Sequence, residues 1–579
     1  MASKGEKNFT IVESSAGSST LIARLRHLFY GDISIANLRV ISIEDGKAGE
    51  GGEPQFQLKR GLKLRHVQLI AIGGAIGTGL FVGSGLTLQS GPAALFIAFA
   101  FMSTIIWCVM QIMAEMITFL PIPGNGPMTF VYDNLSTLFG FAIGWNYWYA
   151  FLMLVAAEVV AAAYVIEYWI QLVNIAVWIT IILAVILILN FTSVKFFGEA
   201  EFWFASIKLI TLTGLLILGV VLFFGGGPNQ TGVLGFWYWR DYPFRQFFYR
   251  GDNDSIIEIT GATGRFLAFW RAVIRSGFAF ICSPELIAAA GGECEKPRHN
   301  IPKAARRFVY RLIFFYCFGT IVIGVIVDSK DPRLLGGASY TSASPFVLGI
   351  TNAGIPVLNH IVNAAILTSA ASSGNSFLFT ALRTMYSLAN RGLAPKVFLK
   401  VNRFGIPYYS VAVLSLLGFL AYLNVSNSSA TAFNWFSNIS TISGFISWVF
   451  VCFAYLRWRK AITYNGLDTR VTYRASLLPW CAYYAIFMVS LISITNGFMV
   501  FFNFNGADFV ATYITLPIVF FLYTAHRLYT VFYLKDKKWL IPIPEIDCST
   551  GLDLIEAEDR NTPLPVPKNW IEKVWYWIA

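Results

Sequence analysis

Long apolar stretches separated by short polar segments fill the chain from residue 69 to about residue 533. A helix that crosses the hydrocarbon core of a bilayer needs about 20 predominantly apolar residues. Stretches of this kind begin near residues 69, 93, 137, 172, 200, 270, 308, 353, 408, 431, 478 and 508. The pattern therefore predicts an all-α integral membrane protein with 12 transmembrane helices.

Polar segments flank these predicted spans on both sides. We expect residues 1–65 to form a cytoplasmic N-terminal tail, residues 66–533 a twelve-helix membrane domain, and residues 534–579 a cytoplasmic C-terminal tail. A cleavable signal peptide is not expected, because the first long apolar run begins only at Leu69. The end of the chain, with Trp570 and Trp575, forms either an interfacial helix or a short helix packed on the cytoplasmic face.

The composition is typical of a membrane protein, since 56% of the residues are hydrophobic and 13% are charged. Soluble domains carry about 25% charged residues. The net charge of +11 does not indicate nucleic-acid binding, because the basic residues lie between the spans. They gather before the first span and after the sixth, eighth and tenth, which predicts that this side and both termini are cytoplasmic. The seven cysteines show no spacing typical of a disulfide framework or a metal site, so no metal is expected.

The first predicted span is unusual in its glycine content. The stretch LIAIGGAIGTGLFVGSG at 69–85 is apolar enough for a bilayer, yet it contains six glycines. Glycine weakens a regular helix, and a broken helix survives in hydrocarbon only where its freed N–H and C=O groups face protein or a water-filled cavity. Close helix packing is the alternative explanation, but it seldom needs glycines at this density. The stretch predicts an interrupted helix that holds a polar solute at mid-membrane.

The sixth predicted span has a corresponding interruption. In the run RAVIRSGFAFICSPELIAAAGG at 271–292, Gly277, Ser283 and Pro284 lie in mid-span, and proline removes a helix hydrogen bond. Interrupted spans at matching places in two halves indicate an inverted-repeat transporter whose site lies near the midplane. Freed N–H groups favour a carboxylate, and opposed carbonyl groups favour an ammonium. One site with both features suits an α-amino acid.

Four ionisable residues stand out inside predicted spans, where such residues are costly and indicate function. Glu158 lies deep in the third span and is predicted to be functional. Lys208 either snorkels to the membrane surface or exchanges a proton from a low-dielectric cavity. Glu285 follows the break in the sixth span and either caps freed N–H groups or binds a proton. Glu115 lies near the end of its span, and a structural hydrogen bond explains it equally well.

Several long motifs resemble those of the fungal amino acid permeases, which belong to the amino acid–polyamine–organocation superfamily. They are GLKLRHVQLIAIGGAIGTGLFVGSG (61–85), GWNYWY (144–149), GEAEFWFASIK (198–208), KPRHNIPKAARR (296–307) and SGNSFLFTALRTMYSLANRGLAPKVF (373–398). The resemblance extends from about Gly61 to the start of the C-terminal tail. It implies a LeuT-like architecture of two five-helix inverted repeats plus two further helices. It also implies proton-coupled uptake of amino acids at the plasma membrane.

The resemblance also implies roles for individual residues. The break of the first span is implied to bind the substrate carboxylate, through Ala75, Ile76, Gly77, Thr78 and Gly79. The stretch Phe278–Ser283 is implied to contact the amino group and side chain and to supply an aromatic gate, through Phe278, Ala279, Phe280, Cys282 and Ser283. Lys208 matches a fifth-span lysine that resembles a replacement for the sodium ion of related carriers, and it is the leading proton-coupling candidate. Glu158, which matches a glutamate facing the pocket, and Glu285 are the other proton-coupling candidates. Asn375 and Ser376 match a motif of the eighth span.

Two features depart from the family pattern. The sixth span of the family usually reads Gly-Thr-Glu, whereas this chain has Ser283, Pro284 and Glu285, which changes the floor of the pocket. Arg271 and Arg275 also stand where the family tends to be uncharged. Arg275 either faces the pocket and favours acidic substrates through a bidentate carboxylate pair, or faces the outer vestibule or the lipid headgroups. The sequence leaves the choice among neutral, broad and acidic amino acids open.

The resulting prediction is a proton-coupled amino acid symporter that works by alternating access. Its expected partners are L-amino acids, protons and the lipid bilayer, and its driving force is a proton gradient without any cofactor. An uncoupled facilitator and a non-transporting amino acid sensor on the same fold are the alternatives, although such sensors tend to carry longer N-terminal extensions. An enzyme is not expected, because no paired acid/base or nucleophile constellation is present.

The tails and the predicted outer loop also carry candidate modification sites. Lys4, Lys7 and Lys47, with nearby serines, make the N-terminal tail a candidate ubiquitylation and phosphorylation platform. Asn229 and Asn253 are glycosylation sequons in the loop that is predicted to lie outside. The sequence does not decide whether they are used.

Overall fold

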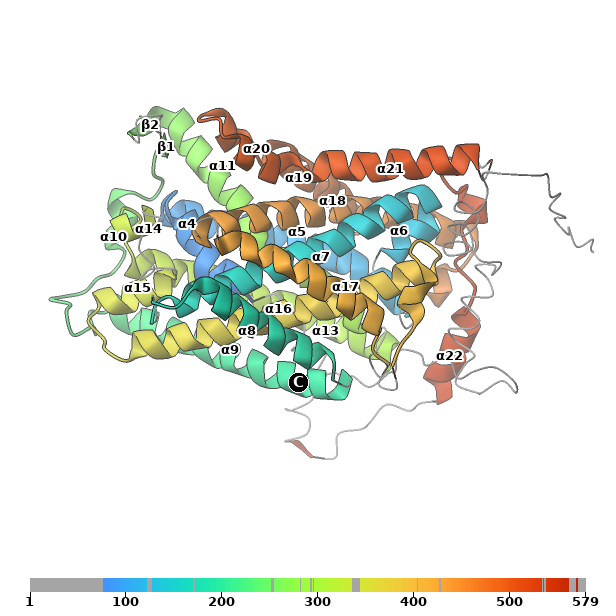
Figure 1. The fold of residues 1–579 in the computed structure, drawn as a ribbon, viewed down its shortest axis with the longest axis horizontal. Helices are drawn as coiled ribbons and strands as arrows, with labels where there is room; N and C mark the ends of the chain where they lie inside the picture. Colours follow the sequence, from blue (N-terminus) through green and yellow to red (C-terminus); the bar gives the residue numbers. More distant parts are fainter. Residues whose placement is uncertain are drawn as a thin grey trace, which may run out of the picture.

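A computed structural model describes residues 76–121, 128–169, 172–192, 194–250, 255–281, 283–291, 294, 296–335, 344–402, 405–425, 429–533, 535, 538–561 and 569–570. These residues form a bundle of helices with a β-hairpin at one end (Figure 1). The predicted N-terminal tail lies outside the described residues, as do the site candidates Ala75 and Cys282 and the sequon at Asn253.

The elements follow one another along the chain as a long series of helices. The first group is η1 (Gly79–Gly83), α4 (Ser84–Leu88), α5 (Pro92–Phe119), α6 (Thr129–Asn134), α7 (Thr137–Ile166), α8 (Ile175–Asn190) and α9 (Val194–Phe223). The second is α10 (Trp237–Asp241), β1 (Phe247–Arg250), β2 (Ile256–Ile259), α11 (Gly261–Phe280), α12 (Ser283–Gly291) and α13 (Pro297–Ile326). The third is α14 (Pro332–Leu335), α15 (Pro345–Asn352), α16 (Leu358–Asn390), η3 (Lys396–Leu399), α17 (Tyr408–Gly418), η4 (Phe419–Val425) and α18 (Ser429–Tyr464). The last is η5 (Asp468–Arg470), α19 (Trp480–Thr495), η6 (Phe498–Phe501), α20 (Gly506–Tyr513), α21 (Thr515–Phe532), η7 (Ile543–Glu545) and α22 (Leu552–Asn561).

Seven helices of the described residues are long and apolar enough to cross a membrane, and counting α20 and α21, which are bent by 48°, as one span raises the number to eight. Three shorter apolar helices lie at the first, fourth and ninth predicted positions, and they are Gly79–Leu88, Ile175–Asn190 and Tyr408–Leu423. The polar-rich helix α16 lies at the eighth. The predicted all-α membrane fold is confirmed, whereas the number of twelve spans stays a prediction.

Local chemistry explains where several helices begin. Asn174 accepts a hydrogen bond from the backbone N–H of Ala176 at 2.9 Å, and it caps α8. Asn505 caps α20 in the same way. Such side chains satisfy N–H groups that lack a partner within the helix. Helix α5 begins with Pro92 directly after Gly91, whose φ of 108° lies in a region that suits glycine.

The two ends of the bundle differ, and we name them after their landmarks. The hairpin end carries β1 and β2, which pair in antiparallel fashion with Phe247 opposite Ile259. Arg271 of α11 attaches the hairpin, because its Nη1 donates to the carbonyl oxygen of Phe248 at 3.2 Å and its Nε to Oγ of Ser90 at 3.2 Å. The tail end, on the right of Figure 1, carries α22.

Two basic residues hold α22 on the tail end. Arg470, between α18 and α19, pairs with Asp553 and donates to Oε1 of Glu556 at 3.0 Å. Arg298, near the start of α13, lies 3.8 Å from carboxylate oxygens of Glu556 and Asp559. The apolar face of this segment is buried against the bundle, through Ile546, Cys548, Leu552 and Ile555.

The helices differ in how much of their surface is buried within the protein. Helix α7 packs most extensively against α16 and α18, and 89% of its apolar window is buried. Only 28% of the corresponding window of α9 is buried, because one face of α9 is exposed at Trp203, Ile210 and Ile217. Exposed apolar side chains on a membrane-spanning helix face lipid. Helix α7 is therefore central, and α9 lies at the edge of the bundle.

Candidate functional site

The described part of the first span begins with a bend. Ile76 and Gly77 are bent rather than helical, and the helical segment starts after Thr78, runs through the π-helix η1 and ends with α4. No side chain caps the start of η1 through a hydrogen bond in this part of the structure. The first N–H groups of a helix lack partners within it and attract negative charge. The carboxylate of Glu158 already interacts with the backbone N–H of Thr78, and the substrate-binding role of Ile76, Gly77, Thr78 and Gly79 stays a prediction.

The sixth span is interrupted between α11 and α12. Helix α11 ends at Phe280, and Ile281 has extended backbone, with φ of −61° and ψ of 143°. Pro284 lies in the first turn of α12, where its missing N–H costs no helix hydrogen bond. Two carbonyl groups freed at the break are already paired, since Tyr316 Oη donates to the oxygen of Ala279 and Ser283 Oγ to that of Phe280, both at 2.6 Å.

The two interrupted spans meet at one point. A Cβ on Gly79 would lie 2.4 Å from the Cα of Ala279, so only glycine allows the two backbones to approach this closely. Phe280 packs beside this contact, against Tyr316 at 4.6 Å and Phe99 at 5.6 Å between ring centroids. The sequence predicted both interruptions. The structure describes the break of the sixth span and the bend at Ile76 and Gly77, and it places Gly79, just after this bend, against Ala279 in the buried core of the bundle.

Lys208 lies next to the first of these breaks. Its Nζ donates to Oγ of Ser373 at 3.1 Å, and that hydroxyl lies 2.9 Å from the point where a Cβ on Gly77 would stand. Oε1 of Glu158 lies 2.6 Å from the same point. Ser369 also reaches the break, because its Oγ donates to the carbonyl oxygen of Ile76 at 3.2 Å. Three helices, α7, α9 and α16, thus bring Glu158, Lys208 and Ser373 to the backbone of Gly77.

A second buried carboxylate, Glu201, belongs to the same cluster and was not predicted. Its oxygens accept hydrogen bonds from Nδ2 of Asn375 at 2.6 Å and Oγ of Ser372 at 2.8 Å. Glu158 and Glu201 both act electrostatically on Lys208, and all three side chains are at most 2% exposed. Glu201 stands seven residues before Lys208, which is two helical turns and the same face of α9. That spacing, within the motif GEAEFWFASIK, is the signal that could have identified it.

The structure places Glu285 apart from this cluster. Its Oε1 accepts a hydrogen bond from Nε1 of Trp448 at 2.5 Å, on α18, and the carboxylate is fully buried at the start of α12. Trp448 is a partner that the sequence did not indicate. Glu115 has a structural environment at the tail end, because it accepts hydrogen bonds from Tyr455 Oη at 3.3 Å and the N–H of Ala475 at 3.1 Å.

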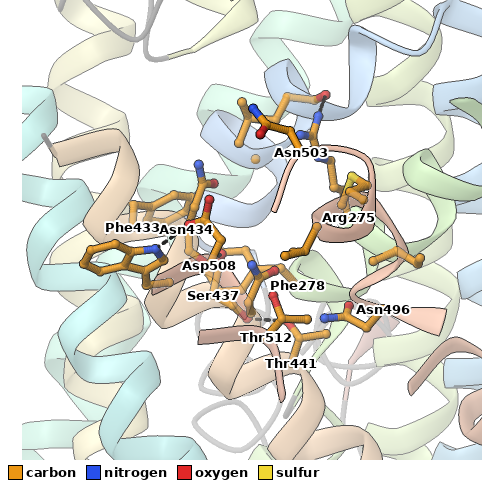
Figure 2. Close-up of a pocket in the computed structure, with 17 residues that line it drawn as sticks. Arg275, Phe278, Phe433, Asn434, Ser437, Thr441, Asn496, Asn503, Asp508 and Thr512 are labelled. Atoms are coloured by element: carbon orange, nitrogen blue, oxygen red, sulfur yellow. Dashed lines mark hydrogen bonds between the residues drawn. The ribbon is translucent and has the colours of Figure 1, made fainter. Parts of the chain in front are cut away.

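Arg275 lines a cavity of about 240 Å³ at the hairpin side of the break (Figure 2). Its Nη1 donates to the carbonyl oxygen of Leu86 at 2.7 Å and to Oε1 of Gln89 at 3.2 Å. Phe278, the predicted gate, also lines this cavity and packs edge-on against Phe433 at 5.3 Å. Arg275 therefore lines a cavity that does not include Gly79 or Ala279.

Comparisons with known proteins add an independent observation. Residues 66–538 match the family described as amino acid permease. The chain is 53% identical over 514 residues to a probable proline-specific permease of Schizosaccharomyces pombe, covering 87% of this chain and 90% of that protein. It is 47% identical over 543 residues to a proline-specific permease of Emericella nidulans, covering 92% and 96%. The fold is similar to that of a manganese transporter of Eremococcus coleocola, with a TM-score of 0.51, 13% identity and coverage of 81% and 94%.

Proposed function

Because this chain belongs to the amino acid permease family, we propose that it imports L-proline together with protons by alternating access. Membership of the family confirms the resemblance predicted from the motifs. Transport of amino acids is the activity of the family's named members, and the identity of the substrate and the coupling to protons are our proposals.

Two relatives named as proline-specific permeases support the choice of substrate, since about half of their residues are identical to this chain over most of its length. The site agrees with a zwitterion whose side chain is apolar. At the crossing of the two breaks the side chains are small or apolar, as at Gly79, Ala279 and Phe280.

In the proposed binding mode, the substrate carboxylate accepts hydrogen bonds from the N–H groups at the start of the helical segment after Gly77. The amino group of proline, which has two N–H donors when protonated, faces carbonyl groups freed at the sixth-span break. The hydroxyls of Tyr316 and Ser283 donate hydrogen bonds to the carbonyl oxygens of Ala279 and Phe280. These two hydroxyls therefore lie beside the carbonyl groups that the amino group would face.

The single observation that carries the proposed coupling is the link from Lys208 through Ser373 to Gly77. The two buried carboxylates favour the charged form of Lys208 and burial opposes it, so loss or gain of one proton in this cluster changes its net charge next to the substrate site. Proton transfer and substrate binding are thereby linked through a shared electrostatic environment. We assign the transferred proton to the cluster of Glu158, Glu201 and Lys208 rather than to Glu285, which lies with Trp448.

We further propose that the hairpin end faces the outside of the plasma membrane and the tail end the cytoplasm. Basic residues gather at the tail end, among them Arg298, Arg457, Arg459 and Arg470. An excess of Lys and Arg is typical of cytoplasmic loops. In this orientation α22 and the segment before it belong to the cytoplasmic C-terminal tail.

The experiment is uptake of labelled L-proline into proteoliposomes, with and without an imposed inward proton gradient, in competition with a panel of amino acids. We expect accumulation that depends on the gradient and is inhibited mainly by proline. Lys208→Ala is expected to abolish accumulation, while Lys400→Ala, at an exposed position, leaves it unchanged. Uptake that is the same with and without the proton gradient would indicate an uncoupled facilitator. Binding of L-proline without uptake would indicate a non-transporting sensor.

A further inference from the structure

The cavity beside Arg275 is separate from the point where the two breaks meet. It is lined by residues of α11, α18, α20 and the turn after α19, and by Gly83 and Leu86 of the first span. Phe278, which precedes Ala279 in the chain, and Phe433 both line it (Figure 2), and their rings pack edge-on at 5.3 Å between centroids. Its volume of about 240 Å³ is just below the range of about 300–1,000 Å³ found for drug-sized ligands. It therefore suits a smaller ligand.

Arg275 brings a positive charge to the cavity without a directly paired carboxylate in the described part of the chain. Among the described residues, its hydrogen-bond partners are the carbonyl of Leu86 and the amide oxygen of Gln89, both uncharged, and no carboxylate pairs with it. A guanidinium is always charged and presents several N–H groups in a planar fork that matches a carboxylate. Removing such a charge from bulk water without a counter-charge is unfavourable. An anion that enters the cavity supplies a counter-charge in direct contact with Arg275.

Asn496 provides a second donor without a partner. The residue is only 3% exposed, and its Nδ2 has no hydrogen-bond partner within the described part of the chain. Figure 2 shows the side chain directed into the cavity, on the opposite side from the backbone of α18. A buried donor without an acceptor destabilises the protein. The same ligand that neutralises Arg275 is expected to satisfy this amide.

The other side of the cavity offers acceptors. Asp508 contributes a carboxylate whose Oδ1 accepts a hydrogen bond from Nε1 of Trp435 at 2.8 Å. Ser437 and Thr441 donate their hydroxyl protons to carbonyl oxygens of their own helix, at 3.0 Å and 2.6 Å. Their oxygen lone pairs therefore remain as acceptors for an ammonium. Apolar side chains complete the lining, and these are Ile274, Phe278, Phe433, Met499 and Val500.

We propose that this cavity is an entry subsite that binds the zwitterionic head of an amino acid before it reaches the central site. The carboxylate would lie on Arg275 and Asn496, and the ammonium on Asp508 and the hydroxyls of α18. Phe278 and Phe433 then separate the entry subsite from the crossing of Gly79 and Ala279, so the ligand passes from one to the other when these rings move apart. This inference rests on the proposed function, since it assumes that the ligand is the transported amino acid.

The test compares wild type with Arg275→Gln and with Arg265→Gln, which alters an exposed arginine of the same helix outside the cavity. Equilibrium binding of labelled L-proline to purified protein measures the number of sites, and uptake measures KM and kcat. We expect two sites in wild type and in Arg265→Gln, and one in Arg275→Gln. In uptake, Arg275→Gln should raise KM about tenfold, the effect of about 1.4 kcal/mol, with kcat changed much less. Asp508→Asn, at the exposed rim, should raise KM in the same way.

Three results would overturn the subsite. If wild type transports L-proline but binds only one molecule of it at equilibrium, there is no entry subsite. Two sites retained in Arg275→Gln place the second site elsewhere. The affinity of wild type for L-proline is also compared in chloride and in gluconate. If the affinity differs between the two anions, and the difference is lost in Arg275→Gln, the cavity is an inorganic-anion site. Absence of uptake of any amino acid by wild type overturns the proposed function and the subsite together, and this outcome is distinguishable because it precedes any variant.

Discussion

Glu158 occupies the space that a side chain on Gly77 would need. Oε1 of Glu158 lies 2.6 Å from the position of a Cβ at Gly77, and Oγ of Ser373 lies 2.9 Å from it. Real Cβ atoms essentially never approach other atoms this closely. The missing side chain at Gly77 therefore brings a buried carboxylate and the hydroxyl that accepts from Lys208 into contact with the backbone of the first-span break.

Gly77→Ala is expected to abolish transport, since the added methyl group forces Glu158 and Ser373 away from the break. The measurement is the initial rate of uptake, normalised to the amount of protein at the surface. Gly214→Ala is the matched control, because nothing lies within 4 Å of a Cβ at Gly214. Uptake by Gly77→Ala at the rate of the control would show that the contact has no functional role.

Glu201→Gln is expected to reduce transport by at least about tenfold, the effect of about 1.4 kcal/mol. Both oxygens of Glu201 accept hydrogen bonds, from Asn375 and Ser372, and the amide of glutamine would point a donor at one of these donors. The substitution also removes one negative charge from beside Lys208. Uptake by Glu199→Gln, on the same helix and half-buried, should be close to wild type. Equal uptake by the two variants would remove Glu201 from the site.

Trp448→Phe is expected to destabilise the protein by about 1–3 kcal/mol, the cost of leaving a buried acceptor without its donor. A smaller aromatic ring remains, but the donor to the buried side chain of Glu285 is lost. Thermal unfolding of the purified protein measures the effect. Trp270→Phe, which removes a bond to the uncharged Thr495, should lower the unfolding temperature less. A larger loss in Trp270→Phe would show that Glu285 does not need its indole partner.

Arg470→Gln is expected to loosen α22 from the tail end. Arg470 pairs with Asp553 and Glu556, and exposed pairs contribute about 0.2–1 kcal/mol each. The thiol of Cys548 is buried in this segment, and its rate of labelling should rise about two- to fivefold in the variant. Arg474→Gln, which removes a pair with Asp468 outside the tail, should leave the rate unchanged. A rate that rises equally in both variants would exclude a specific role for Arg470.

Docking of α22 should also weaken in acid. Hydrogen bonds and charge from Arg470 hold the pKa of Glu556 below its ordinary value, with smaller contributions from Arg298 and Arg560. A lowered native pKa stabilises the docked state above the ordinary pKa and loses this contribution as the pH falls through the lowered value.

Hydrogen exchange of residues 552–561, corrected for the intrinsic pH dependence of exchange, should therefore accelerate below about pH 4.5, the ordinary value for glutamate. In Arg470→Gln the transition should move to higher pH. A transition at the same pH in both proteins would contradict the assignment to Glu556.

The sequence predicted those features that depend on neighbouring residues. Hydropathy located the spans, and the glycines near Gly77 and the Ser283–Pro284 pair located the two interruptions, because both effects act within a few residues of the chain. The crossing of Gly79 with Ala279 required three-dimensional information, although its two halves were predicted separately.

Other parts of the site depend on contacts between distant residues. Trp448 lies 163 residues from Glu285, and Tyr316 lies 37 residues from Ala279, so no local pattern indicates either pair. The β-hairpin in the loop between the fifth and sixth spans, where Phe247 pairs with Ile259, was not predicted. Glu201 was overlooked although its seven-residue spacing from Lys208 was visible in the sequence.

Helix α9 holds Lys208 inside the bundle while Trp203 and Ile210, which are 65% and 73% exposed, face lipid. A rotation of α9 about its own axis would carry the ammonium toward hydrocarbon, where a charge at the helix centre costs about 2.5–3.5 kcal/mol even on the mildest scale. The cost of exposing Lys208 to lipid therefore opposes rotation of α9 about its own axis.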